Sequence, residues 1–257
     1  MVKGLAIFKK YFADYTGSYE IIGGTARDIH ISEAAFEPKG TKDIDIILLV
    51  EAINPDFVVQ FWKFINEGGY ERKEESAEDR KYYRFTRPAN AAFPGLIELF
   101  ARKPDVIILK KGAHLTPIPA GEGLTSLSAI LVNDDYYNYL MEHSSIKEGL
   151  HLANPEILIC LKAKAFLEIS DRIANGSKEE PKLIKKHKED IFRLSVLLTA
   201  EQVFELPGSI KKDLQQFANI IAENLPGNHV FDDMGMVGMD AGKALLQLIK
   251  NFNLDTE

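Results

Sequence analysis

The run from Asp43 to Val50, DIDIILLV, constrains the fold more than any other stretch of the chain. Its β-branched and apolar residues predict a central strand that is buried on both faces of a sheet. Alternate residues of a strand point to the same side, so Asp43 and Asp45 project together while Ile44 points the other way. Two carboxylates this close repel each other unless a positive charge lies between them.

A divalent cation that prefers carboxylate oxygens, such as Mg²⁺, supplies such a charge. Phosphoryl-transfer sites with two metal ions commonly use a third acidic residue. Glu98 is the candidate, because it stands within the apolar run Leu96 to Phe100, where a lone carboxylate is costly to bury. If the two strands are neighbours, Glu98 lies beside the aspartates. In the alternative interpretation, Glu98 faces solvent and the aspartates only end their strand.

Upstream, the short apolar run Tyr19 to Ile22 predicts a strand that ends in a turn at Gly23 and Gly24. Glycines allow close approach of the backbone to a ligand, and N–H groups at the start of a following helix attract anions. Thr25 is expected to cap that helix and to add a hydroxyl donor. The sequence therefore predicts a phosphate-binding turn next to the paired aspartates.

The remaining pattern separates an α/β part from a helical part. In the first part we expect helices at residues 4–15 and 55–68 and strands at residues 82–85, 95–101 and 105–109. After residue 112 we expect short strands at residues 127–132 and 150–152 and helices at residues 136–143, 156–174, 181–198, 210–224 and 241–252. Glycine and proline concentrate at residues 112–123, so we place a domain boundary in residues 110–125 and predict two domains, 1–115 and 116–257.

Composition limits the class of protein. The net charge of -7 gives no global attraction to nucleic acid, so any such contact needs a local basic patch. No apolar run approaches the roughly 18 residues of a membrane span, and the first residues do not resemble a signal peptide, so we expect a cytoplasmic protein. The single cysteine, Cys160, lies in an apolar run and is expected to be a buried structural thiol. His30 and His187 are expected to be structural, because no His/Cys cluster has metal-ligand spacing.

Two blocks of the sequence carry a family resemblance. They are Ile22-Gly23-Gly24-Thr25-Ala26 and Thr41-Lys42-Asp43-Ile44-Asp45-Ile46. Together they resemble the polymerase-β-like nucleotidyltransferase superfamily, and most of all its AbiEii/AbiGii-toxin type. The resemblance covers about residues 19–50, 94–103 and 155–195. It implies an α+β fold, in which a mixed-sheet core is followed by a helical C-terminal lobe that completes a cleft.

The resemblance also implies a reaction. Two Mg²⁺ ions, or Mn²⁺ in their place, would be held by an acidic triad of Asp43, Asp45 and Glu98. The phosphates of an NTP would be held by Gly23, Gly24 and Thr25. An acceptor hydroxyl would attack the α-phosphate in line, and pyrophosphate would leave.

Two later motifs of the family lie on the expected helices. Lys162 matches a phosphate-binding lysine, with Lys164 as the alternative. A lysine in so apolar a segment extends its ammonium group to the surface or binds an anion. In the alternative interpretation, it only lies at the border of the buried face of a helix. Asp190 matches the first acid of a second motif, but Arg193 stands where its second acid is usual, which leaves the substrate open.

Several functional alternatives remain. The family type implies a toxin of a toxin–antitoxin pair, with tRNA or another RNA as acceptor and a cognate antitoxin as partner. A small-molecule, aminoglycoside-type enzyme would need an acidic pocket, for which the candidates are Glu74, Glu75, Glu78 and Asp79. A nucleotide-binding module without catalysis is the third alternative. The basic run 182–188 would face a phosphate backbone or solvent, and Arg27 and Asp28 would pair with the phosphate-binding turn or with each other.

Overall fold

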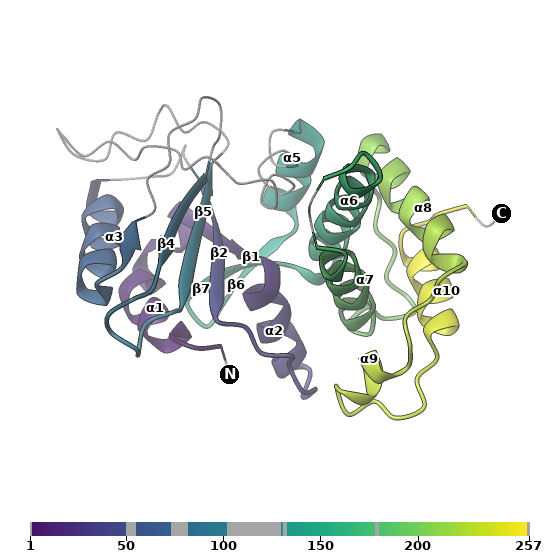
Figure 1. Ribbon diagram of the computed structural model, residues 1–257, viewed down its shortest axis with the longest axis horizontal. Helices are drawn as coiled ribbons and strands as arrows, with labels where there is room; N and C mark the ends of the chain where they lie inside the picture. Colours follow the sequence, from purple (N-terminus) through teal and green to yellow (C-terminus); the bar gives the residue numbers. More distant parts are fainter. Residues whose placement is uncertain are drawn as a thin grey trace. The chain divides into compact units, whose positions relative to one another are not determined.

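The computed structural model describes residues 2–49, 55–72, 82–101, 130, 133–177 and 180–255. Its fold is mixed α+β, and the chain divides into two compact units (Figure 1). The first unit comprises Met1–Asp28, Gly40–Gly121 and Ser144–Ala153, and the second comprises Ile29–Lys39, Glu122–His143 and Asn154–Glu257. The boundary predicted in residues 110–125 lies outside the described residues, so it stays a prediction.

The described residues of the first unit contain a mixed sheet of seven strands in the order β3-β4-β5-β2-β1-β7-β6. The strands are β1 Tyr19–Ile22, β2 Asp43–Leu48, β3 Glu71–Arg72, β4 Tyr82–Thr86, β5 Leu96–Ala101, β6 Ser144–Lys147 and β7 Leu150–Ala153. Strand β2 pairs parallel with β5 and antiparallel with β1, so Asp43–Leu48 is a central strand, as predicted. Strand β6 was not predicted, because its sequence SSIK is short and mostly polar.

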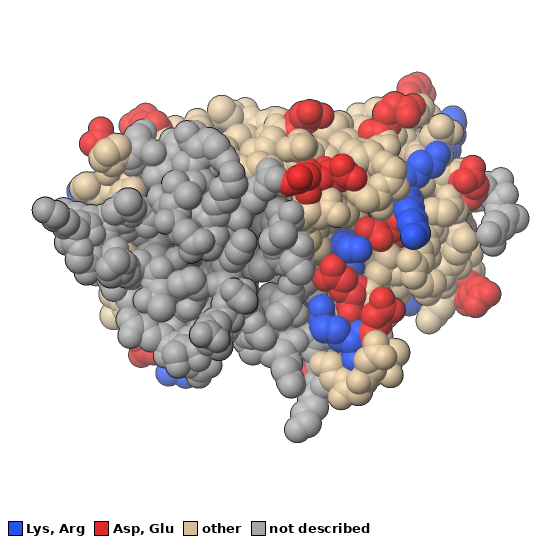
Figure 2. All heavy atoms as spheres, turned by 90° about the horizontal axis from the view of Figure 1, so that it is seen from above, with Lys and Arg blue, Asp and Glu red and all other residues tan. Residues whose placement is uncertain are grey.

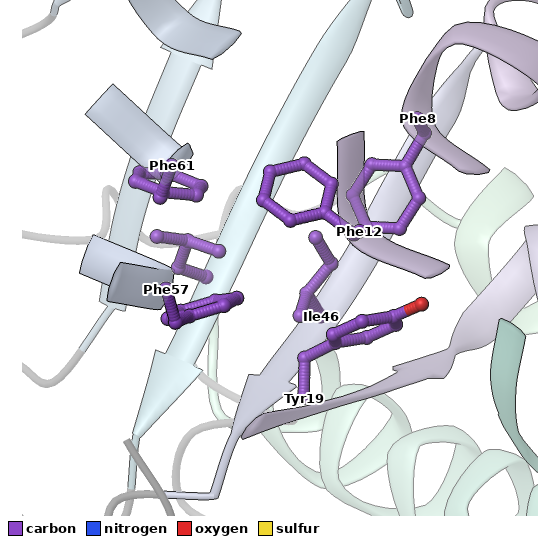
Figure 3. Close-up of a pocket in the computed structure, with 7 residues that line it drawn as sticks. Phe8, Phe12, Tyr19, Ile46, Phe57 and Phe61 are labelled. Carbon is purple, nitrogen blue, oxygen red and sulfur yellow. The ribbon is translucent and has the colours of Figure 1, made fainter. Parts of the chain in front are cut away.

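One face of this sheet is covered by aromatic side chains from helices α1 (Leu5–Phe12) and α3 (Pro55–Gly68). Figure 3 shows Phe8 and Phe12 of α1 near Tyr19 and Ile46 of the sheet, with Phe57 of α3 close by. These rings are almost fully buried, and burial of each contributes about 2–3 kcal/mol. Because strand side chains alternate, the residues between those of this face point to the opposite face of the sheet.

Helix α2 (Gly23–Glu33) begins where β1 ends. The prediction that Thr25 caps this helix is wrong, because the helix already starts at Gly23 and Thr25 lies within its first turn. Gly23 has a φ of 66°, a left-handed conformation that glycine adopts without strain. The chain therefore passes from strand to helix through the first glycine alone.

The described part of the second unit is mostly helical. Its helices are α5 Asp134–Glu142, α6 Pro155–Ala174, α7 Lys182–Ser195, α8 Gly208–Ala222, α9 His229–Asp232 and α10 Ala241–Asn251. Helix α6 packs against α5, α7 and α8, and is buried on most of its circumference. The one-turn helix α9 was not predicted, because four residues carry no helical period. The strands predicted at residues 105–109 and 127–132 lie outside the described residues, apart from Ile130.

Candidate active site

Four residues on four neighbouring strands form a row on the sheet face opposite α1 and α3. Asp45 of β2 lies opposite Ile22 of β1 and Glu98 of β5, and Glu98 lies opposite Arg84 of β4. Neighbouring strands lie roughly 4.8 Å apart, so these side chains meet across the sheet. The expectation that the strand of Glu98 neighbours the strand of the aspartates is thus confirmed. Asp43 lies two residues before Asp45 on the same face, opposite Leu96.

Gly23 brings the backbone of the strand-to-helix junction against Asp45. A Cβ atom at position 23 would overlap Oδ2 of Asp45, so any side chain there would displace the carboxylate. At Gly24 a Cβ would lie 3.3 Å from Oγ1 of Thr41, which is a tight contact but not an overlap. Asp45 therefore lies between the backbone of Gly23 on one side and Glu98 on the other.

Thr25 connects the first turn of α2 to the start of β2. Its buried hydroxyl donates a hydrogen bond of 2.6 Å to the backbone carbonyl of Asp43. The hydroxyl proton is therefore used inside the protein, whereas the sequence assigned it to a phosphate. What Thr25 does in this structure is to hold the strand that carries the aspartates against the helix.

Glu98 is bound by Arg84 through one oxygen. Nε of Arg84 donates to Oε1 at 2.9 Å, and Nη2 lies 2.8 Å from the same oxygen. Burial raises the pKa of Glu98 to about 8, the charge of Asp45 and a hydrogen bond with it act in the same direction, and Arg84 opposes them. Burial and the neighbouring Asp45 thus outweigh Arg84 in setting the pKa of Glu98.

The donor chemistry of this row suits a hard divalent cation, because Asp43, Asp45 and Glu98 offer only carboxylate oxygens. Among the described residues, no group of three or more His, Cys, Asp or Glu side chains is already arranged to hold a metal ion. The contact of Arg84 with Oε1 of Glu98 gives one physical reason. Cation binding by these acids would require their side chains to rearrange.

In the second unit, the two predicted nucleotide-binding residues Lys162 and Asp190 bind each other. Nζ of Lys162, on α6, donates to Oδ2 of Asp190, on α7, at 2.8 Å. Asp190 is fully buried and Lys162 is 7% exposed. His187, one turn before Asp190, has its pKa lowered to about 3 by burial, with the charge of Lys162 acting in the same direction.

Lys164 and Arg193, the other residues considered in these two motifs, also bind groups within the protein. Lys164, the alternative phosphate lysine, lies 3.1 Å from Oδ2 of Asp213, and both side chains are more exposed than the Lys162 pair. Arg193, which replaces the second acid of the family motif, is buried and donates to the carbonyl of Val230 at 2.9 Å. Arg193 thus ties α7 to α9, a structural use that the sequence did not predict.

The basic run on α7 is largely compensated by nearby acceptors. Lys182 pairs with Glu180, and Lys185 lies 3.6 Å from Glu189. Lys188 donates to the carbonyl of Asn224 at 3.0 Å. In the view of Figure 2, the described surface has Lys and Arg lying among Asp and Glu rather than in a patch of one sign.

The sequence interpretation missed two charged residues on the site face of the sheet, Arg84 and Glu20. Glu20 of β1 lies opposite Ile47, one row below Asp45, and is fully buried. Neither of its carboxyl oxygens has a hydrogen-bond partner in the described structure, and burial raises its pKa to about 9. Glu20 could have been found from the sequence, because it is an acid within an apolar strand, which is the pattern that identified Glu98.

Other sequence predictions have mixed outcomes. Arg27 and Asp28 form a buried ion pair at 2.6 Å, so they pair with each other. Cys160 is fully buried, and burial raises the pKa of its thiol, as expected of a structural cysteine. The acidic residues 74, 75, 78 and 79 lie outside the described residues. Within the described ranges, every helix is too short or too polar to cross a membrane.

The chain has a distant likeness among solved structures. No protein-family model matches the chain, and no curated protein matches it. Among solved structures, an antigenic nucleotidyltransferase-like protein from Paracoccidioides brasiliensis is similar, with 16% sequence identity and a TM-score of 0.43. The match covers 86% of this chain and 90% of that protein.

Proposed function

We propose that this protein is a metal-dependent nucleotidyltransferase, which moves a nucleotide from an NTP to an acceptor hydroxyl and releases pyrophosphate. One observation carries the proposal: Asp45 and Glu98 lie side by side in register, with the backbone of Gly23 against Asp45. Paired carboxylates next to a helix start combine a cation site with an anion site. Nucleotide transfer from a metal-bound triphosphate needs both.

In this proposal Asp43, Asp45 and Glu98 hold two Mg²⁺ or Mn²⁺ ions, which would offset the charge that develops on the phosphates. Glu98 is also the candidate base that takes the proton from the acceptor hydroxyl. The hydroxyl oxygen bonds to the α-phosphorus while the bond to pyrophosphate breaks. The N–H groups of Gly23 and Gly24, at the start of α2, are the candidate donors to the phosphates.

Thr25 and the second unit have supporting roles in the proposal. Thr25 supports the nucleotide site indirectly, because its hydroxyl donates to the carbonyl of Asp43 rather than to a phosphate. Lys162 is the candidate triphosphate lysine, with Lys164 as the alternative. Because Lys162 is bound by Asp190, we propose that Asp190 holds its ammonium group in place until an anion shares it.

The acceptor follows from the sequence resemblance alone. We propose an RNA acceptor such as tRNA, for a cytoplasmic toxin with a cognate antitoxin. The AbiEii-like block at residues 22–46 supports this step. A small-molecule acceptor of the aminoglycoside type is the alternative, and a nucleotide-binding module without catalysis is the third.

The reaction is tested with labelled NTPs, Mg²⁺ and total tRNA. We expect label transfer by the wild-type protein and a loss of about a thousandfold in Asp45→Asn, because the amide cannot hold a cation in place of the carboxylate. Asp56→Asn, an exposed aspartate at the start of α3, is the matched control and should keep full activity. Equal labelling by the wild type and Asp45→Asn would exclude the catalytic assignment.

The acceptor is tested by the same assay with tRNA and a panel of small cationic amines. Transfer to tRNA alone supports the RNA proposal, and transfer to amines alone supports the alternative. If neither is labelled, but the protein binds an NTP with Mg²⁺, the module without catalysis is favoured.

A further inference from the structure

Arg84 is the one charged residue of the row that the proposed reaction does not use. It comes from β4, near the edge of the sheet, and its side chain is 28% exposed. Two of its nitrogens contact the same oxygen of Glu98, at 2.9 Å and 2.8 Å. The guanidinium therefore occupies Oε1, an oxygen that a cation at this site would otherwise use.

The charges of the row explain why this contact forms. Glu98 is 9% exposed and lies beside Asp45, so its ionised form needs a compensating cation. In the described structure Arg84 supplies that charge. A guanidinium beside the site also repels any second cation that approaches the same oxygens. Arg84 and a divalent ion thus compete for one carboxylate.

Arg84 is able to leave this position. Its side chain reaches solvent, and a long arginine side chain can keep its head group in water while its stem stays on the sheet. Glu98, in contrast, is fixed on a central strand between β2 and β4. Exchange of the counter-ion therefore moves Arg84 rather than Glu98.

We propose that Arg84 is a counter-ion gate of the carboxylate site: it holds Glu98 while no divalent cation is bound, and it leaves Oε1 when one binds. This inference takes from the proposed function only the idea that the acids bind a divalent cation. It makes the cation affinity of the site depend on a residue that is not itself a ligand.

The direction in which cation affinity changes when Arg84 is replaced distinguishes the gate from a role in orienting Glu98. If Arg84 competes with the cation, removing its charge tightens cation binding. If Arg84 only orients Glu98 as a ligand, removing it weakens cation binding. Binding measured on the protein alone, without turnover, distinguishes the two.

The test measures the Kd of Mn²⁺ by titration calorimetry and by the loss of the free-ion electron paramagnetic resonance signal. We expect Arg84→Met to bind Mn²⁺ at least tenfold more tightly than the wild type. Arg87→Met is the matched control, because Arg87 forms an exposed ion pair with Glu71 near the same edge of the sheet, and it should change the Kd less than twofold. Weaker or unchanged Mn²⁺ binding by Arg84→Met would overturn the gate.

A second variant protects the test against misfolding. Arg84→Lys keeps the charge but loses the two-nitrogen contact, so its Kd should fall between those of the wild type and Arg84→Met. Circular dichroism and thermal melting show whether each variant is folded. If Arg84→Met does not fold, a Kd for Arg84→Lys equal to or weaker than that of the wild type overturns the proposal.

The gate and the proposed function fail in distinguishable ways. Asp45→Asn should remove tight Mn²⁺ binding from both the wild type and Arg84→Met, which locates the ion at this row. Tighter Mn²⁺ binding by Arg84→Met without any nucleotide transfer would support the gate and reject the transferase. Transfer by the wild type without tighter binding by Arg84→Met would reject the gate alone.

Discussion

Two sets of charged residues differ in their balance of charge: the carboxylate row of the sheet and the ion pair between α6 and α7. In the row, Glu98 contacts the guanidinium of Arg84 at 2.8 Å and has Asp45 beside it on the neighbouring strand. In the pair, Nζ of Lys162 lies 2.8 Å from Oδ2 of Asp190. The row therefore sets two acids side by side, whereas the pair sets one acid against one base.

The difference indicates what each set is suited for. Two buried acids placed side by side lower the stability of the fold, and such pairs are found where a ligand of opposite sign binds. A buried pair of opposite charges is stable before any ligand binds, but becomes costly when one member is removed. We therefore expect substitutions in the row to change binding and activity with little loss of stability, and substitutions in the pair to lower stability.

The largest effect on stability is expected from Lys162→Met. It leaves the carboxylate of Asp190 buried without its ammonium partner, which should lower the free energy of unfolding by about 3–5 kcal/mol. Urea unfolding measures the change. The double variant Lys162→Met/Asp190→Leu should recover most of it, because neither member of the pair is then left buried without the other.

The control for this prediction is Lys164→Met, in the more exposed pair with Asp213. This pair is half-buried, and the hydroxyl of Tyr136 still donates to Asp213 when Lys164 is replaced, so the loss should be smaller than in Lys162→Met. A loss in Lys162→Met no larger than that in Lys164→Met would remove the distinction between matched buried charge and surface charge.

The next largest change in stability is expected from Glu20→Gln, which should stabilise the protein. Above its ordinary pKa of 4.5, Glu20 loses its proton in the unfolded chain but keeps it in the folded one, up to about pH 9. The stability of the wild type therefore falls between these values as pH rises. Glu20→Gln escapes this loss and should be more stable by about 3 kcal/mol at pH 7.

Chemical denaturation at pH 5, 7 and 9 measures this advantage, which should grow with pH. Glu148→Gln is the control, because Glu148 is 84% exposed and should show no such trend. An advantage of Glu20→Gln that is constant with pH would mean that Glu20 is already ionised in the folded protein.

The smallest effect is the stability change of Asp45→Asn. Removing one acid from the row relieves its repulsion with Glu98, and the amide that replaces the accepting carboxylate can donate a hydrogen bond to Glu98. We expect a gain of about 1 kcal/mol, measured by urea unfolding at neutral pH. A loss of several kcal/mol would show that the row is a structural element like the Lys162 pair.

The central strands and their acids were predictable, because the signal is local. An apolar β-branched run that begins with Asp43 and Asp45 indicates a buried strand. Glu98 is likewise an acid within an apolar run, where a carboxylate is costly to bury. The parallel pairing of β2 with β5 brings these acids together. From the sequence this pairing was only a hypothesis, and the strand register of the structure establishes it. No sequence period specifies which strands become neighbours.

Arg84 and the partners of Lys162 could not be assigned in the same way. Arg84 lies between aromatic residues in an expected strand, but its importance depends on the hairpin register that sets it opposite Glu98. Lys162 and Asp190 were both singled out, yet as ligands of one nucleotide rather than of each other. Residue type limits the chemistry of a side chain, and only the packing of helices decides which partner it meets.

The contact of Gly23 with Asp45 has a consequence for chirality. The two α-hydrogens of this glycine are not equivalent, because the one that an L side chain would replace faces Oδ2 of Asp45. A D-residue has its side chain on the other hydrogen, and its backbone favours the positive φ of 66° found here. A semisynthetic protein with D-alanine at position 23 would thus keep the conformation and leave the carboxylate in place, whereas L-alanine would disturb both.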